Sequence, residues 1–275
     1  MLRPRETSRR GKYRMTGVLC LGALVAVSAG CNTVRRNRTE IAAPADGWNA
    51  PAAVDIENFH GTVTVVVDPT LTEVRPTFKA HASLWIEDAV RKQAIESVKV
   101  RTRTLDQEGR AVYSVRTSTT WGDPKQVWID VTLRMPRCDG VRVFNRGGHV
   151  RVWGVGGAIQ VDNGEFAGGE GGIEIRTDQD IADPVALITS EGNIVYQVGP
   201  GSTGEYTLDA PDGDETFDSN ILLPGMIHTN GSITTASVGA RDGTPAENAV
   251  LLKTARGDTT VIYMNEPMKY RRWEP

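Results

Sequence analysis

The stretch Ile56-Glu57-Asn58-Phe59-His60-Gly61-Thr62-Val63 decides the fold of this chain. Apolar and polar residues alternate on either side of a central glycine. Strict alternation indicates a strand with one buried face, and glycine supplies the positive φ that a tight corner needs. The stretch therefore predicts two short strands joined by a corner.

The same unit recurs along the chain, once with an inserted loop and once in a form one residue shorter. The further copies are Val143–Val150, Val161–Ile173, Leu187–Ile194, Ile227–Ile233 and Leu252–Thr259. The corner glycines in equivalent places are Gly61, Gly148, Gly192, Gly231 and Gly257. With Gly171 of the looped copy included, the successive steps from Gly148 to Gly257 are 23, 21, 39 and 26 residues, which suggests a coil of about twenty residues, as in stacked repeat architectures. One coil of this length cannot bury its own apolar face, so the coils must stack.

Two-residue alternation also occurs between the copies and predicts further strands. The alternating segments are Val54–Ile56, Val63–Val67, Val98–Val100, Val127–Leu133 and Val141–Val143. One interruption has helical spacing instead, with Trp85, Ala89, Ile95 and Val98 recurring among charged residues after Ser83, a candidate N-cap. We therefore predict a mostly β, solenoid-like stacked β-helix with a short helical insertion near residues 86–97.

The repeat resembles a bacterial family of β-strand-repeat, adhesin-like domains of unknown function, similar to the head domains of auto-transporter adhesins. The resemblance covers roughly Ala53 to Met264 and rests on the Ile56–Val63 unit and on the Asn145–Gly148, Asn230–Gly231 and Thr254–Gly257 corners. It implies a secreted or envelope protein with a stacked β-helix-like body. The expected domain spans residues 52–265, followed by a C-terminal tail at 266–275.

The N-terminus has the parts of a lipoprotein signal peptide at residues 1–30. A basic segment precedes an apolar run from Val18 to Gly30, and Cys31 follows small residues, as in a bacterial lipobox. The run is shorter than the ~20 residues that a transmembrane helix needs. We therefore expect lipid on Cys31, a polar lipidated tether at 31–51 and a location in the cell envelope. Asn32, in place of the aspartate that favours inner-membrane retention, points to the outer membrane.

Charge and cysteine content narrow the function further. The full chain has a net charge of −3, and loss of the basic signal would leave a more acidic body. Proteins bind nucleic acids through clustered Lys and Arg. Because the mature body would be acidic, we expect no nucleic-acid partner. With Cys20 in the signal and Cys31 lipidated, Cys138 has no partner for an intramolecular disulfide in the mature chain.

No catalytic, cofactor-binding or metal constellation stands out in the sequence. His60, His149 and His228 lie beside corners, and stacking could gather them into a metal cluster, although exposed corners tolerate any polar residue. The acidic residues Asp209, Asp212, Asp214, Glu215 and Asp218 could hold calcium, but their spacing differs from an EF-hand and suits a solvated turn. We expect no cofactor and no metal.

These observations favour a non-catalytic envelope lipoprotein with a role in binding, adhesion or envelope structure. Its partners would be the membrane, through Cys31, and a glycan or an envelope protein. One alternative is a carbohydrate-active lyase or hydrolase, because β-helices can present paired carboxylates to a glycan. A second alternative is an accessory subunit in the periplasm. A carboxylate pair about 5–10 Å apart or a row of exposed aromatic residues would favour the carbohydrate-active reading.

Overall fold

The computed structural model describes residues 39–41, 53–107, 109–164, 171–219, 225–230, 233–239 and 244–269. Contacts divide the chain into two units, Met1–Arg35 and Arg36–Pro275, and the described residues belong to the second. The predicted signal peptide and Cys31 therefore lie outside the described residues. Part of the predicted tether is ordered, because Thr39–Ile41 forms strand β1.

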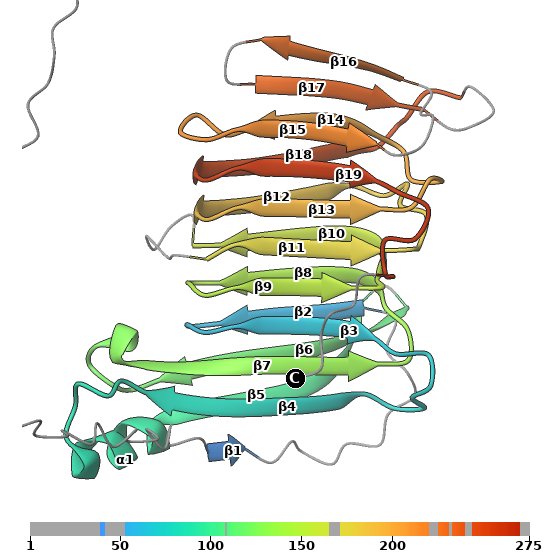
Figure 1. The fold of residues 1–275 in the computed structure, drawn as a ribbon. Helices are drawn as coiled ribbons and strands as arrows, with labels where there is room; N and C mark the ends of the chain where they lie inside the picture. The colour runs from blue at the N-terminus through green and yellow to red at the C-terminus, as the bar shows by residue number, and fades with distance from the viewer. Residues whose placement is uncertain are drawn as a thin grey trace, which may run out of the picture. The chain divides into compact units, whose positions relative to one another are not determined.

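The described residues are mostly β and form two mixed sheets, as the alternation predicts (Figure 1). Sheet A has nine strands, in the order β1 (Thr39–Ile41), β4 (Arg75–Ala82), β7 (Val127–Met135), β3 (Val63–Val67), β9 (Val150–Trp153), β11 (Ile173–Thr177), β13 (Ile194–Val198), β19 (Thr259–Tyr263) and β15 (Glu215–Ser219). Sheet B has ten strands, in the order β16 (Gly225–Asn230), β17 (Ile233–Val238), β14 (Gly204–Asp209), β18 (Ala249–Arg256), β12 (Val185–Glu191), β10 (Gly156–Asn163), β8 (Asp139–Asn145), β2 (Ala53–Asn58), β6 (Arg110–Thr119) and β5 (Val98–Gln107).

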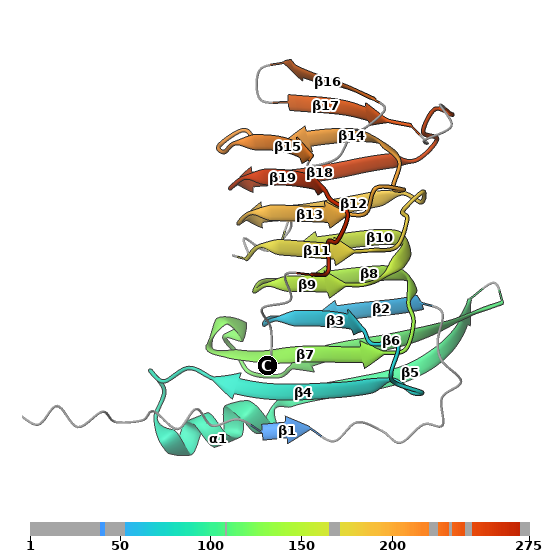
Figure 2. The same cartoon turned by 45° about the vertical axis from the view of Figure 1, so that its right-hand side comes forward.

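Parallel pairing dominates the middle of both sheets, antiparallel pairs close both ends of sheet B and the β1 end of sheet A, and β15 pairs parallel at the other end of sheet A. At each repeat corner the chain leaves a strand of sheet B and enters a strand of sheet A, as from β8 to β9 and from β12 to β13. We call each such couple a strand pair. Strand pairs stack on one another, so each strand inside the stack, such as β10 or β11, has parallel neighbours on both sides (Figure 2).

The stacking order differs from the order along the chain. The pair β2–β3 is the first in sequence, yet it lies between β6–β7 and β8–β9. The pair β18–β19 is the last, yet it lies between β12–β13 and β14–β15. Both ends of the repeat region are therefore inserted into the stack rather than added to its ends.

The core lies between the two sheets and is built from the inward half of each alternating segment. Val54 and Ile56 of β2, Val63 and Val65 of β3, and Ile129 of β7 are all buried. Aliphatic side chains that stand perpendicular to both sheets fill the interior. Val67 and Val100, at the ends of their alternating segments, are only half-buried.

The helix predicted near residues 86–97 is present as α1 (Asp88–Glu96), but its N-terminus differs from the prediction. Glu87 is the N-cap and makes no side-chain cap, whereas the Oγ of Ser83 accepts a hydrogen bond from the Trp85 amide at 3.3 Å. A short 3-10 helix, η1 (Pro124–Gln126), precedes β7. The described residues contain no helix of the length and apolar character that a membrane crossing requires.

The corner glycines form a column along the stack. Gly61, Gly148, Gly192 and Gly257 have φ values of +119°, +98°, +119° and +136°, and Gly171 joins the same column. A Cβ added to Gly192 would lie 2.6 Å from the Gly171 carbonyl carbon, so the stacked backbones leave no room for a side chain. Glycine is therefore required both by the corner conformation and by close stacking.

The copy at Ile227–Ile233 is not a corner between the sheets, so that part of the repeat assignment is wrong. Its two strands, β16 and β17, pair with each other antiparallel in sheet B, with Asn230 opposite Ile233. Gly231 itself lies outside the described residues. The sixth place in the glycine column belongs instead to Gly213, where an added Cβ would collide with the carbonyl of Gly257. A hairpin and a corner use the same turn residues, which is why the sequence pattern confuses them.

A buried polar column runs beside the glycines. The Asn58 side chain donates to Asn145 Oδ1 at 3.0 Å, and Asn145 donates to Asn163 Oδ1 at 2.9 Å. Asn145 and Asn163 also donate to corner carbonyls, including those of Gly147 and Gly171. Thr189 and Thr254 continue the column on β12 and β18, each donating to a corner carbonyl. These amides satisfy the backbone oxygens that a tight corner leaves free, so they fix the corners inside the core.

Candidate functional site

A row of side chains crosses the outer face of sheet B, one from each neighbouring strand. The register places Asp55 of β2 opposite Arg142 of β8, and Arg142 opposite Gln160 of β10. The row continues through Ala186 of β12 and Leu251 of β18. Directly opposite residues share a face of a sheet, so these side chains all point away from the core.

A groove of about 1070 Å³ follows this row across the strands. Its lining changes along its length, from Asp55, Arg110, Arg142 and Gln160 at one end to Ala186 and Leu251 at the other. Neighbouring strands lie about 4.8 Å apart, so the groove offers a regularly spaced contact to an elongated ligand. We regard it as the candidate binding site.

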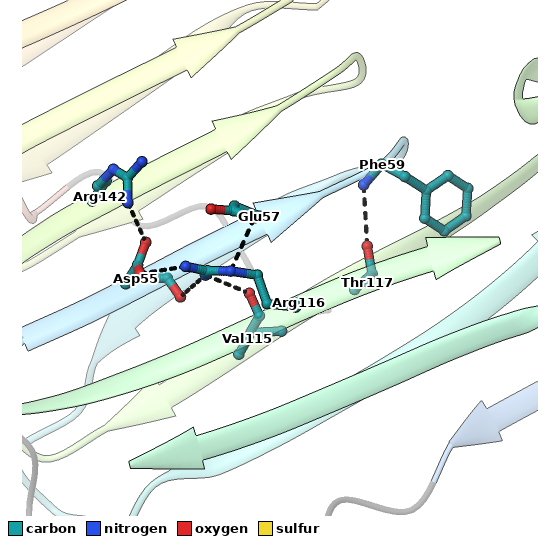
Figure 3. A network of polar contacts seen from close by, with 7 residues as sticks. All are labelled: Asp55, Glu57, Phe59, Val115, Arg116, Thr117 and Arg142. Carbon is teal, nitrogen blue, oxygen red and sulfur yellow. Dashed lines mark hydrogen bonds and ion pairs between the residues drawn. The ribbon is translucent and has the colours of Figure 1, made fainter. Parts of the chain in front are cut away.

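The carboxylates at the charged end of the groove form ion pairs with arginines (Figure 3). The Asp55 carboxylate binds Arg116 at 2.6 Å and Arg142 at 3.3 Å, and Glu57 binds the Arg116 Nε at 2.9 Å. Arg116 also donates to the backbone carbonyls of Asp55 and Val115. Asp55 is only 6% exposed, so its charge needs these partners. Both carboxylates are bound to guanidinium groups, an arrangement that suits positioning of the arginines rather than proton transfer.

Arg103 extends the row beyond Asp55 to the edge of the sheet, and two further cations lie along the same edge strand, β5. Arg103 of β5 lies opposite Ser114, which in turn lies opposite Asp55. Lys99 and Arg101 precede it on the same face of β5, and all three side chains are exposed. We call Lys99, Arg101 and Arg103 the cationic stripe. Among the described residues, no acidic side chain forms an ion pair with any of the three.

A further arginine, Arg116 of the neighbouring strand β6, lies beside the stripe. Arg101 lies directly opposite Arg116, a like-charge pair that is normally avoided across strands. Arg116 forms ion pairs with Asp55 and Glu57, whereas no acidic side chain in the described ranges pairs with Arg101. The outer face of sheet B therefore ends in an excess of positive charge, on a chain whose net charge is −3.

The histidines that could have formed a metal cluster do not come together. Within the described ranges, no group of three or more His, Cys, Asp or Glu residues is placed to hold a metal ion. Burial and the nearby Lys125 lower the pKa of His60, while the His149 Nδ1 accepts a hydrogen bond from the Gly172 amide. The structure does not describe the side chain of His228.

The acidic residues between Asp209 and Asp218 serve the local backbone and one lysine. Asp209 forms an ion pair with Lys253 at 3.4 Å, and Glu215 accepts a hydrogen bond from the Ala210 amide. The Asp214 amide donates to Asp258 of the neighbouring corner. Oxygen atoms used in this way do not converge on one point, so the described geometry offers no calcium cage.

Cys138 is buried and its thiol donates to the Gly140 carbonyl at 3.3 Å. Burial raises the pKa of this thiol to about 12, so it is not a nucleophile at neutral pH. Cys31, the predicted lipidation site, lies outside the described residues.

Sequence reasoning did not find the groove or the stripe. The sequence does show polar residues alternating with valine and isoleucine around Asp55 and Arg142, which identifies them as outward-facing. It does not show that β2 is a neighbour of β6, because those two strands are far apart in the chain. The odd-numbered run Lys99, Arg101 and Arg103 was the available signal, since three cations at a spacing of two share one strand face.

No family model and no curated protein matches this chain. Two solved structures are similar to it at 8% sequence identity. One is a candidate cell adhesion protein from Clostridium sporogenes, with a TM-score of 0.46 over 84% of this chain and 100% of that chain. The other is a candidate adhesin from Bacteroides fragilis, with a TM-score of 0.26 over 82% of this chain and 96% of that chain. Because similarities of this size carry no functional inference, we derive a function from this chain's own side chains.

Proposed function

We propose that this chain is a non-catalytic, adhesin-like envelope lipoprotein that binds an extended anionic ligand on the outer face of sheet B. The strand pairs, which cross from one sheet to the other at each glycine corner, support a solenoid-like β-helical body. Such a body is stabilised by contacts between neighbouring pairs, which leaves its outer faces free for recognition.

Lipid on Cys31 would hold this body in the envelope. The basic segment, the short apolar run and the small residues before Cys31 support this assignment, and Asn32 supports the outer membrane. Several acyl chains, each contributing about 0.8 kcal/mol per buried CH₂, would make the attachment effectively permanent.

The observation that carries the ligand proposal is the cationic stripe, which has no acidic partner in the part of the chain that the structure describes. Its side chains follow one another along β5 at about 7 Å, twice the rise of a strand residue, and Arg103 lies at the end of the row that lines the groove. An acidic polysaccharide, with a carboxylate or sulfate on successive units, offers anions at regular intervals to such a stripe. Its uncharged parts would lie along the groove toward Ala186 and Leu251.

The engaged carboxylates support a binding role over glycan cleavage. A retaining or inverting glycosidase needs one carboxyl group that can donate a proton and one that stays free to attack or activate water. At this site Asp55 contacts two arginines and Glu57 contacts one. Neither carboxylate is placed to exchange protons with a ligand.

The test is a glycan array probed with the full chain and with two double variants. We expect Arg101→Gln/Arg103→Gln to weaken binding to acidic glycans about tenfold, because each exposed ion pair contributes about 0.2–1 kcal/mol. The matched control, Arg75→Gln/Lys92→Gln, removes the same charge from exposed sites elsewhere and should bind as the wild type does. Binding that is equal in both double variants would reject the stripe, and turnover of any glycan would favour the carbohydrate-active alternative.

A further inference from the structure

Two large hydrophobic side chains stand exposed side by side between β4 and α1. Leu84 is 52% exposed and Trp85 is 97% exposed. Among the described residues only Ile233, on β17, is also a large hydrophobic side chain with this degree of exposure. An almost wholly exposed tryptophan next to an exposed leucine forms an apolar patch, the kind of surface that interaction partners or membranes cover.

The backbone beneath the two side chains is firmly held. The Ser83 amide donates to the Gln126 carbonyl at 2.8 Å, and the Arg91 guanidinium donates to the carbonyls of Ser83, Leu84 and Ile86. Asp88 fixes the same guanidinium through an ion pair at 2.6 Å. Arg91 therefore holds the backbone of Ser83–Ile86, which we call the tip. The fold itself keeps Leu84 and Trp85 at this exposed position.

The first described residue of β1 lies beside the end of β4 that leads to Leu84. β1 pairs antiparallel with β4, with Thr39 opposite Ala80, so Thr39 lies beside the last residues of β4. The start of β1, the end of β4 and α1 lie on one side of the sheets (Figures 1 and 2). Cys31 precedes Thr39 by about eight residues, a stretch that spans at most roughly 28 Å.

We propose that Leu84 and Trp85 insert into the headgroup boundary of the membrane that carries the lipid on Cys31. This inference rests on the lipid anchor proposed above. Tryptophan and leucine are side chains that settle at this boundary, tryptophan because its ring is amphipathic. A lipid tether raises the local concentration of bilayer near the tip, so even a weak insertion becomes populated.

Such a contact would fix the orientation of the folded body relative to the membrane. A lipid alone lets the body rotate about a flexible tether, whereas a second contact at the β4–α1 end fixes that end against the bilayer. The sheets then extend away from the membrane along the stack. The outer face of sheet B, with its groove and its cationic stripe, is presented sideways to the surroundings rather than to lipid.

The test uses the full, lipidated chain reconstituted in phosphatidylcholine vesicles that contain a lipid brominated near the headgroup. We expect the bromines to quench part of the tryptophan fluorescence, and we expect Trp85→Phe to lose that part. Trp121→Phe is the matched control, because Trp121 is half-buried beside Gln126 and its loss should leave the quenched part in place. Equal quenching in the wild type and in Trp85→Phe would overturn the proposal.

A second measurement separates this inference from the anchor on which it rests. The mass of the N-terminal peptide shows whether Cys31 carries lipid. If it carries lipid and Trp85 is not quenched, the insertion proposal fails while the anchor stands. If Cys31 carries no lipid, the same quenching is measured at high vesicle concentration. Quenching that requires Trp85 then supports insertion, and its absence overturns it.

Discussion

At the scale of single residues, the corner glycines combine two requirements that are usually met separately. A positive φ alone disfavours other residues, and so does a neighbouring backbone in van der Waals contact. Gly109 has a φ of +78° with nothing within 4 Å of an added Cβ, whereas Gly192 has both the positive φ and the close backbone of Gly171. Comparing Gly109 with Gly192 therefore separates the free-energy cost of the backbone conformation from that of the close stacking.

We predict that Gly109→Ala lowers the free energy of unfolding by about 1 kcal/mol and that Gly192→Ala lowers it by more than about 3 kcal/mol. The larger loss reflects two strand pairs that must separate to admit a methyl group. Urea denaturation followed by circular dichroism measures both values. Equal losses at the two sites would contradict the close stacking of the corners.

Three buried tyrosines give the protein a pH dependence at the alkaline end. Burial raises the pKa of Tyr196 and of Tyr206 well above the usual 10, and it also raises that of Tyr263. The folded state holds these hydroxyls neutral, while the unfolded chain loses their protons near pH 10. Stability is therefore complete below pH 10 and falls as the pH rises above it.

We predict that Tyr196→Phe reduces this alkaline loss while leaving stability at pH 7 unchanged or higher. The Tyr196 hydroxyl is buried with no hydrogen-bond partner in the described structure, so its removal costs no interaction. Thermal melts from pH 8 to pH 11 measure the effect. A marked loss of stability at pH 7 would mean that the Tyr196 hydroxyl makes a hydrogen bond in the folded protein.

At the scale of elements, the strands and the helix could be predicted while their pairing could not. The alternation of valine and isoleucine with polar residues identifies strands, because burial of one face is a local property of the sequence. Pairing depends on which of several similar corners stack together, and each copy presents nearly the same surface to its neighbours. The placement of β18 beside β12 joins residues more than sixty positions apart, such as Ala186 and Leu251, and no local pattern encodes it.

The placement of β18 can be tested by chemical crosslinking. With cysteines at Ala186 and Leu251, or at Leu251 and Thr207, the two side chains would lie on adjacent strands about 4.8 Å apart. We predict that a bismaleimide with a short spacer joins either pair rapidly, since Cys138 is buried and does not compete. Cysteines at Ala186 and Thr207 have β18 between them and should react slowly. Rapid crosslinking of that third pair would indicate stacking in chain order.

At the scale of the whole molecule, the inserted pair β18–β19 couples both sheets. β15 has β19 as its partner in sheet A, and β14 is joined to β12 only through β18. In a repeat protein that stacks in chain order, loss of the last repeat shortens the array and leaves the rest intact. Here the last pair is interior, so its loss separates the stack into two parts.

We predict that a chain ending at Ala246 loses the whole cooperative unfolding transition of the described body. Loss of only the contribution of one strand pair would leave a smaller cooperative transition. A chain ending at Lys269 retains every described strand and serves as the control. Differential scanning calorimetry of the two proteins measures the difference. A truncated chain that melts cooperatively, with a modestly lower transition temperature, would show that β18–β19 is dispensable.

For the exported lipoprotein that we propose, the interior position of the last strands would also set the order of assembly. A translocon would deliver the N-terminus first, so the strands around β12 and β14 would arrive well before β18. Until the final segment was delivered, those strands would expose open edges that can pair with any other chain. A chaperone that shields strand edges would therefore be needed only until the C-terminus was released.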